Sequence, residues 1–262
     1  MAKVALISYT KESELIVACA AKLCYSSEEI AKLKEGLTPS KISSFIDMLA
    51  KLGHESPIEH ASFTFGIEGV SRALLAQITR HRIASFSVQS QRYVSEEGGF
   101  SYVIPPEISK DKEANQVFSR VMEECEKSYE NLVSILRKNH QSKLISRGMD
   151  TNEAQKLAQK MSIEDARFVL PNACKTKMIC TFNARSLMNF FGRRLCNRAQ
   201  WEIRELALLM LKSVLEVAPN LFSRAGPACL YSFCKEGKMS CRREKEVKSF
   251  FMDILKNSKI RV

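Results

Sequence analysis

The densest polar chemistry in the chain lies in one short segment, residues 80–92, with the sequence RHRIASFSVQSQR. It places three arginines, one histidine and three serines within thirteen residues. Arginine can hold a phosphate or a carboxylate through two parallel hydrogen bonds, so three arginines together indicate an anion site for a phosphorylated ligand. The alternative is a solvated helix end, because cations are favoured at a helix C-terminus. On this segment alone both interpretations stay open.

The apolar residues before this segment indicate which elements hold it. Leu74, Leu75 and Ile78 form one stripe within residues 71–78, a spacing typical of an amphipathic helix. Upstream, residues 61–70 alternate between apolar and polar side chains, which predicts a half-buried strand. The arginines are therefore expected at the end of a short helix that follows a strand.

The other elements are predicted from hydrophobic periodicity and from signals at helix ends. Thr38 and Pro39 predict the start of a helix that Gly53 ends, and Ser162 predicts the start of another helix that Pro171 stops. The remaining expected elements are a strand at 4–10, helices at 13–22, 40–52 and 111–139, a strand at 177–182, and helical stretches from 185 and at 199–217. No internal repeat or low-complexity linker interrupts them.

The length of 262 residues fits one domain with a tail, and a chain of this size needs no disulfide or metal to fold. Nine cysteines, an odd number with no signal peptide before them, are typical of a reducing cytoplasm. No apolar run approaches the roughly 18 residues of a membrane span, so a soluble protein is expected. In the tail, Cys229, Cys234 and Cys241 are loosely spaced and no histidine follows them, so free thiols are expected rather than a metal site.

The formal net charge is +11, from 40 lysines and arginines against 29 aspartates and glutamates. A basic protein favours anionic partners, a class that includes nucleic acid, nucleotides and polyglutamylated cofactors. Part of the excess lies in residues 235–261, where a solvated surface accounts for most of it. No RNA-binding signature with stacking aromatic residues accompanies these charges, so nucleic acid is not the expected partner.

Arg80-His81-Arg82, seven further residues and then Ser90 resemble the RHR-x7-S signature of the flavin-dependent thymidylate synthases. Two other segments support the resemblance in the right order, HESPIEH at residues 54–60 and NARSLMNF at residues 183–190. The second of these is followed by Arg194 and by the sequence AQWEI.

This similarity covers roughly residues 1–220 and fades in the tail. The chain is therefore identified as a member of the family, with a catalytic domain at residues 1–218. Residues 219–262 form a basic, cysteine-containing extension to which the resemblance gives no role.

The resemblance implies an α+β fold in which a twisted, mainly antiparallel sheet is packed with long helices. It implies an enzyme that converts dUMP to dTMP by reductive methylation in the cytoplasm. The carbon donor would be 5,10-methylenetetrahydrofolate, the hydride donor FAD reduced by NADPH, and the folate product tetrahydrofolate. It also implies a homotetramer whose active sites draw residues from several chains, with no membrane partner.

The resemblance also carries over site residues. The dUMP site is expected to contain Gln77, Ile78, Thr79, Arg80, Gln89, Ser90, Gln91, Arg92, Arg167 and Arg194. The FAD site is expected to contain Ser56, Arg80, His81, Arg82, Asn183, Ala184, Arg185 and Asn189. Arg92 and Arg167 would hold the phosphate, and the four-residue spacing of Arg185 and Asn189 puts both on one helix face. His54 is expected near the flavin or folate, with a hydrogen-bonded structural histidine as the alternative.

Arg194 is the expected catalytic residue, because it matches the family arginine that lies against the uracil and favours its N3-deprotonated form. A cation held beside a developing anion in a poorly hydrated site is usually the largest catalytic contribution. Arg193 next to it leaves open an assignment shifted by one residue. One departure from the family is Val88, which stands where many relatives have Glu, so that carboxylate contact is missing or is supplied by Gln89.

No protein nucleophile is expected. The Pro-Cys-Gln tripeptide of the folate-only thymidylate synthases is absent, so each cysteine is expected to be a small buried hydrophobe. Ser90 lacks a paired base in the sequence and is expected to contact and orient a ligand. Two other functions stay as alternatives: a basic nucleic-acid-binding protein with salt-dependent affinity, and a flavin or nucleotide binder that has lost methylation, for which Val88 is the only indication.

Overall fold

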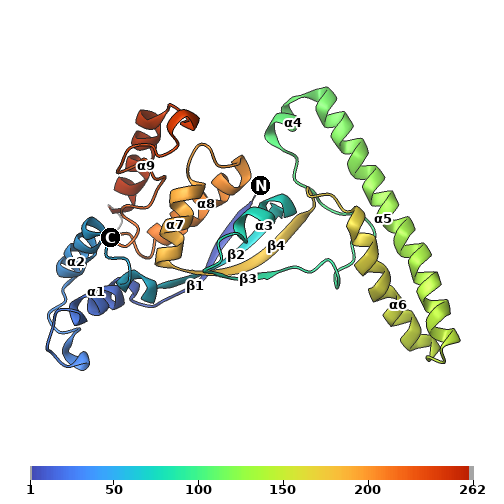
Figure 1. The fold of residues 1–262 in the computed structure, drawn as a ribbon, viewed down its shortest axis with the longest axis horizontal. Coiled ribbons are helices and arrows are strands. Elements are labelled where there is room, and N and C mark those ends of the chain that lie inside the picture. The colour runs from blue at the N-terminus through green and yellow to red at the C-terminus, as the bar shows by residue number, and fades with distance from the viewer. Residues whose placement is uncertain (1, 260–262) are drawn as a thin grey trace. The chain divides into compact units, whose positions relative to one another are not determined.

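The computed structural model describes residues 2–259 and contains a four-stranded sheet (Figure 1). Its strands are β1 (Lys3–Tyr9), β2 (Ser62–Ser71), β3 (Ser85–Val88) and β4 (Lys175–Asn183), in the order β1-β2-β4-β3. β1 pairs antiparallel with β2, and the register is irregular between Leu6 and Ser8. The sheet together with the helices described below makes this an α+β protein, as expected.

The chain divides into two compact units. The helical unit comprises residues 69–75 and 88–177, and the larger unit comprises residues 2–68, 76–87 and 178 onward. Strands β2 and β4 and helix α3 (Arg72–Ile78) each contribute residues to both units. Each unit has its own buried side chains and is described by itself.

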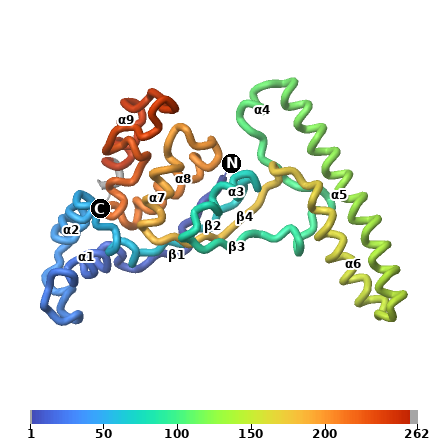
Figure 2. Tube along the Cα trace, viewed as in Figure 1, coloured from blue at the N-terminus to red at the C-terminus, as the bar shows by residue number. Residues whose placement is uncertain are grey.

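The larger unit combines the first and the last parts of the chain, which Figure 2 follows from blue to red. Helix α8 packs against strand β1 and against α7, and α1 packs against α2. The helices of this unit are α1 (Ser13–Leu23), η1 (Ile30–Lys32), α2 (Pro39–Leu52), η2 (Pro57–His60), α7 (Ala184–Arg194), α8 (Trp201–Leu215), η4 (Gly237–Met239) and α9 (Glu244–Lys259).

An aromatic cluster forms the core of the larger unit. The alternation of β2 buries Phe63 and Phe65, and the ring of Phe63 meets that of Phe222 edge-on at 5.2 Å between centroids. On β4, Phe182 is buried in the same way and contacts Phe190 of α7 at 5.7 Å. These contacts fix α7 against the sheet, which matters because α7 carries much of the site.

The helical unit is dominated by one pair of helices. In it, α5 (Lys112–Ser146) and α6 (Thr151–Ala166) run antiparallel and pack along their length (Figure 1). Tyr129, Val133 and Ala166 are fully buried in this pair. Short helices α4 (Pro106–Lys110) and η3 (Arg167–Val169) flank the pair in the chain.

Most predicted elements are confirmed, including the helix that Thr38 begins and Gly53 ends. The Thr38 hydroxyl accepts from the Lys41 amide, and Gly53 has the left-handed φ of 71° that suits glycine at a helix end. The long helix predicted at 111–139 continues to Ser146. The sequence did not predict strand β3 or helix α9, because neither has a strong period and clear end signals together.

The predicted start of a helix at Ser162 is wrong. Helix α6 begins at Thr151, where the carboxylate of Asp150 accepts from the amides of Asn152 and Glu153. Ser162 lies in the last turns of that helix, and its hydroxyl donates to the carbonyl of Gln159. Ser162 and the two acidic residues after it resemble a capping sequence, but a serine hydroxyl can also bond back within a helix.

None of the helices within residues 2–259 combines the length and the apolar character that crossing a membrane requires. Within the same residues, no group of three or more His, Cys, Asp and Glu side chains is arranged to hold a metal ion. The predicted boundary between residues 218 and 219 stays a prediction, with α8 ending at Leu215.

Candidate active site

Helix α7 begins directly where strand β4 ends. Asn183, the last residue of β4, accepts from the backbone amide of Ser186 through Oδ1 at 2.8 Å and so caps the helix. The apolar face of α7 is buried, with Leu187, Phe190 and Phe191 fully enclosed. The polar residues of α7 are left on the opposite face, because the helical period separates them from the apolar ones.

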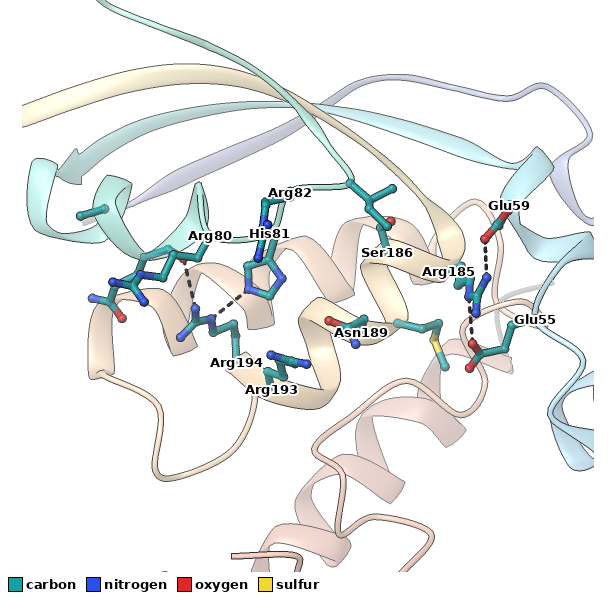
Figure 3. A pocket seen from close by; sticks show the side chains of 14 residues that line it. Glu55, Glu59, Arg80, His81, Arg82, Arg185, Ser186, Asn189, Arg193 and Arg194 are labelled. Atoms are coloured by element: carbon teal, nitrogen blue, oxygen red, sulfur yellow. Dashed lines mark hydrogen bonds and ion pairs between the residues drawn. The ribbon is translucent and has the colours of Figure 1, made fainter.

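That polar face borders a cavity of about 1160 Å³ within the larger unit (Figure 3). The other wall comes from the end of α3 and the residues after it, and from the segment before β2. The lining residues are Glu55, Glu59, Ala76, Gln77, Arg80, His81, Arg82, Ile83, Arg185, Ser186, Met188, Asn189, Arg193 and Arg194. Five of these are arginines, so the cavity is suited to an anionic ligand.

Arg194 is held in place by two hydrogen bonds from its guanidinium. Nε donates to Nε2 of His81 at 3.1 Å, and Nη2 donates to the backbone carbonyl of Gln77 at 3.1 Å (Figure 3). Neither acceptor is a carboxylate, so the positive charge of Arg194 is not neutralised by these contacts. The remaining N–H groups of the guanidinium are left for a ligand.

His81 is neutral near pH 7. Burial, followed by the positive charges of Arg194 and Arg193, lowers the pKa of His81 to about 4. Since Nε2 accepts a hydrogen bond from Arg194, the ring proton of the neutral imidazole is assigned to Nδ1. The ring also meets Phe190 edge-on at 5.0 Å, which connects His81 to the aromatic core.

Arg194 lies in a crowded cationic environment. Burial is the main cause that lowers the pKa of its guanidinium, and the neighbouring charges of Arg193 and Arg80 lower this pKa further. These arginines repel one another when no anion is present. An anionic ligand in the cavity would relieve that repulsion, so the geometry favours binding a phosphate or an anionic ring here.

Arg185 at the other end of the cavity has two carboxylate partners. Nε donates to Glu55 Oε2 at 2.9 Å, and Nη1 donates to Glu59 Oε1 at 2.6 Å (Figure 3). Both carboxylates raise the pKa of Arg185, and the side chains are about half exposed. The two carboxylates outweigh the one guanidinium at this end of the cavity, whereas the end around Arg194 is strongly positive.

Several predicted flavin residues come together in this cavity. Arg80, His81 and Arg82 line it from one segment, and Arg185 and Asn189 line it from α7. The predicted shared face of Arg185 and Asn189 is therefore confirmed. Asn183 and the fully buried Ala184 are not lining residues, since Asn183 caps α7. Ser56 precedes helix η2, and its carbonyl accepts from the amide of Glu59.

The predicted nucleotide residues fall into two groups. Gln77, Arg80 and Arg194 line the cavity, whereas Ile78 is fully buried in the core. Thr79 and His54 are not among the lining residues. The other predicted nucleotide residues, in the helical unit, are Gln89, Ser90, Gln91, Arg92 and Arg167.

In the helical unit, Arg92 and Arg167 meet at Glu164. Arg92 Nε forms an ion pair of 2.6 Å with the Glu164 carboxylate, and Arg167 Nε donates to the Glu164 backbone carbonyl at 3.1 Å. The Ser90 hydroxyl accepts from the Arg92 amide at 3.1 Å, which orders the turn that carries Arg92. Two arginines 75 positions apart in sequence thus contact the same residue, one through its side chain and the other through its backbone.

Sequence reasoning missed several lining residues, namely Glu55, Glu59, Ala76, Ile83, Ser186 and Met188. The spacing of Glu55 and Glu59 was a usable signal, since both belong to the segment HESPIEH. Ser186, Asn189 and Arg193 recur at helical spacing beside Arg185, so the polar face of α7 was also detectable.

Three cysteines are buried, Cys174, Cys180 and Cys229, whereas Cys24 is exposed and the other five are partly exposed. The expectation that each cysteine is a small buried hydrophobe is therefore wrong for Cys24. Burial raises the pKa of Cys174 and of Cys180 to about 12, so neither forms a thiolate near neutral pH. No cysteine lines the main cavity. This supports the prediction that a cysteine is not the nucleophile.

Comparisons with known proteins identify the family. A family model described as "Thymidylate synthase complementing protein" matches residues 5–220. A flavin-dependent thymidylate synthase of Clostridium tetani is 52% identical over 250 residues, covering 95% of this chain and 97% of its own. The chain belongs to the flavin-dependent thymidylate synthases. The resemblance drawn from the three motifs is therefore confirmed.

Other flavin-dependent thymidylate synthases match at lower identity. That of Geobacter sulfurreducens is 47% identical over 96% of this chain and 99% of its own, and that of Pyrococcus furiosus is 38% identical over 90% of each. The family model ends at residue 220, where the similarity was expected to fade. The match to the Clostridium relative covers 95% of the chain and therefore extends beyond residue 220. Part of the tail is thus shared with that relative.

Proposed function

We propose that the protein methylates dUMP to dTMP, with 5,10-methylenetetrahydrofolate as carbon donor and FAD reduced by NADPH as hydride donor. Tetrahydrofolate is the folate product. The observation that carries the proposal is that motif residues more than a hundred positions apart, Arg80 to Arg82 and Arg185 to Arg194, line one cavity in a member of this family. The reaction makes the protein an enzyme of dTMP biosynthesis in the cytoplasm.

The cavity has the donors that FAD requires. A flavin dinucleotide carries a diphosphate, which cations bind, and an isoalloxazine edge, which amide and hydroxyl groups bind. Arg80 and Arg82 supply cations, and Ser186 and Asn189 supply the neutral polar groups, while Arg185 is already paired with Glu55 and Glu59. The volume of about 1160 Å³ lies slightly above the range of about 300–1,000 Å³ typical of ligand pockets. Bound FAD would accept electrons from NADPH and deliver the hydride.

Arg194 is the residue we assign to the reacting ring. Its contacts to His81 and Gln77 orient the guanidinium and leave N–H groups of Nη1 and Nη2 for a ligand. A fixed cation against the uracil stabilises the ring after loss of the N3 proton, and so favours attack by C5 on the methylene group. Neutral His81 acts as a positioning residue, because it accepts from Arg194 without neutralising its charge.

Arg92 and Arg167 are the residues we assign to the nucleotide phosphate. Their shared contact with Glu164 supports this role, because the carboxylate orients Arg92 and the backbone carbonyl orients Arg167. A phosphate would replace part of the carboxylate's contact with Arg92. Lysine cannot reproduce the planar fork of arginine, so replacement of Arg92 by lysine is expected to weaken dUMP binding although the charge is kept.

A separate proposal concerns how many copies of the chain assemble. We infer a homotetramer in which the nucleotide, flavin and folate sites draw residues from several chains. The family resemblance supports it. A single chain would then be inactive, because residues of other copies complete each site.

The test is an absorbance spectrum of the purified protein, followed by a turnover assay. A flavin band that NADPH bleaches faster with dUMP present would support the cofactor and its coupling to the nucleotide. Formation of dTMP with all substrates present would support the methylation reaction itself. A protein that cannot be reconstituted with FAD would overturn the proposal. A flavin-loaded tetramer that forms no dTMP would point instead to a binder that has lost methylation.

A further inference from the structure

A second, smaller cavity of about 410 Å³ adjoins the main one in the larger unit. Arg193 and Arg194 line both cavities, so this pair of arginines separates them. The rest of the second cavity comes from the loop between α7 and α8 and from the tail, in particular Arg198, Cys229 and Lys235. The tail therefore builds a wall beside the proposed catalytic arginine.

The tail is held at this position by specific contacts. The amide of Ala228 donates to the carbonyl of Gly192 on α7 at 3.2 Å. The amide of Cys234 donates to the Glu244 carboxylate at 3.2 Å, which ties the cavity wall to helix α9. Helix α9 is itself anchored by the buried side chains of Val247 and Phe251. The second cavity is thus part of the folded structure.

The second cavity has a marked excess of positive charge. Its charged lining residues are Arg193, Arg194, Arg198, Lys235 and one carboxylate, Glu236. Within the described part of the chain, the side chains of Arg193, Arg198 and Lys235 form no ion pair. Arg194 bonds only to neutral acceptors. Like charges gathered around one cavity repel each other unless an anion enters.

We propose that the second cavity is an anion subsite that binds a phosphate or carboxylate group of a substrate whose reactive part lies in the main cavity. The inference rests on the proposed function for the identity of that substrate. Two substrates of the reaction carry such groups, the nicotinamide cofactor with its phosphates and the folate with its glutamate carboxylates. A volume of about 410 Å³ accommodates a fragment of either molecule, within the range of about 300–1,000 Å³ of ligand pockets.

The test uses variants that change only the second cavity. Arg198→Gln and Lys235→Gln each remove one exposed charge that does not line the main cavity. Lys238→Gln is the matched control, since Lys238 is an exposed lysine of the same tail that lines neither cavity. Affinity for inorganic pyrophosphate is measured by calorimetry on protein supplied with FAD and dUMP. KM and kcat are then measured for NADPH, NADH, and mono- and polyglutamylated methylenetetrahydrofolate.

An anion subsite predicts that pyrophosphate affinity falls about fivefold to tenfold in both cavity variants and is unchanged in the control. A raised KM for NADPH at constant kcat would identify the phosphate as the natural group, and a raised KM for the polyglutamylated folate would identify the carboxylates. Equal pyrophosphate affinity in all variants would overturn the subsite. Unchanged KM values for every substrate would overturn its assignment to this reaction. The pyrophosphate measurement needs no turnover, so it stands even if the proposed function fails.

Discussion

Arg194 combines two properties that a lysine cannot reproduce together. Its planar guanidinium bonds to His81 through one nitrogen and to the Gln77 carbonyl through another, and still presents N–H groups to the cavity. A lysine ammonium can donate to one of these acceptors only by turning away from the ligand. The geometry of this residue, beyond its charge, is what we expect turnover to depend on.

Replacement Arg194→Lys is therefore expected to lower kcat by roughly 100-fold or more while flavin content is unchanged. Steady-state dTMP formation and the absorbance of bound flavin measure the two quantities. Arg120→Lys, at an exposed position of α5, is the control and should retain full activity. Full activity of Arg194→Lys would remove this residue from the catalytic role and favour Arg193.

His81 links stability to pH. Burial and two arginines lower its pKa from 6.5 in the unfolded chain to about 4 in the folded one, so the unfolded chain binds more protons between these values. The stabilisation due to neutral His81 is present above about pH 6.5 and is lost as the pH falls toward 4. Urea unfolding of the ligand-free protein should therefore give a lower free energy of unfolding at pH 5 than at pH 7. The His81→Gln variant should show a smaller difference between the two pH values.

His60→Gln serves as the control for this experiment, because His60 is exposed and lies outside the cavity. The pH dependence of unfolding in this variant is the baseline against which the His81 variant is compared. An identical loss in the His81 variant would show that other groups cause the acid sensitivity.

At the scale of elements, the start of α6 is one of the points at which sequence and structure differ. Asp150 satisfies two amides at the helix N-terminus, whereas Ser162 bonds back to Gln159 within the helix. Asp150→Ala is expected to lower the free energy of unfolding by about 1 kcal/mol, the usual cost of losing a helix cap. Chemical denaturation measures this change.

Ser162→Ala is the comparison for that measurement. It should lower the free energy of unfolding by less than Asp150→Ala does, since a hydroxyl bonded back to its own helix adds little to stability. A larger loss for Ser162→Ala would mean that the buried Ser162 hydroxyl contributes more to the free energy of unfolding than the Asp150 cap does.

Helix α7 shows how one element can serve both the core and the site. Its apolar face carries Phe190 and Phe191 into the aromatic cluster, and its other face carries Arg185, Asn189 and Arg194 to the cavity. The rigidity of the packed face fixes the polar face, because core side chains are held by many contacts.

At the scale of the whole molecule, the inferred tetramer makes a specific prediction about mixed chains. Arg92 belongs to the helical unit and Arg194 to the larger unit. Arg92→Gln and Arg194→Gln are each expected to be inactive alone. If one site takes these residues from different copies, co-assembly should restore activity to about a quarter of the unmodified level, since random mixing leaves both residues intact in that share of sites.

The check is to unfold and refold the two variants together, confirm the assembly by light scattering, and measure dTMP formation. Each variant refolded alone is the control. No recovery in a confirmed mixed assembly would mean that one chain supplies both arginines.

The sequence by itself determined the local structure and the family. Alternating residues gave strand β2, a helical stripe with Thr38 and Gly53 at its ends gave α2, and three short motifs gave the flavin-dependent thymidylate synthases. These features depend on residues close together in the chain, whose spacing follows directly from the helical and strand periods. The shared face of Arg185 and Asn189 was predictable for the same reason.

Only the tertiary structure decided which distant residues meet. Arg194 bonds to His81 across 113 positions, and Arg185 pairs with Glu55 across 130. It also decided that the tail builds a second basic cavity beside Arg193. Such contacts follow from how buried aromatic faces pack, and one sequence does not encode that packing in any short pattern. The chemistry of each residue is therefore local information, whereas its partner and its cavity are properties of the fold.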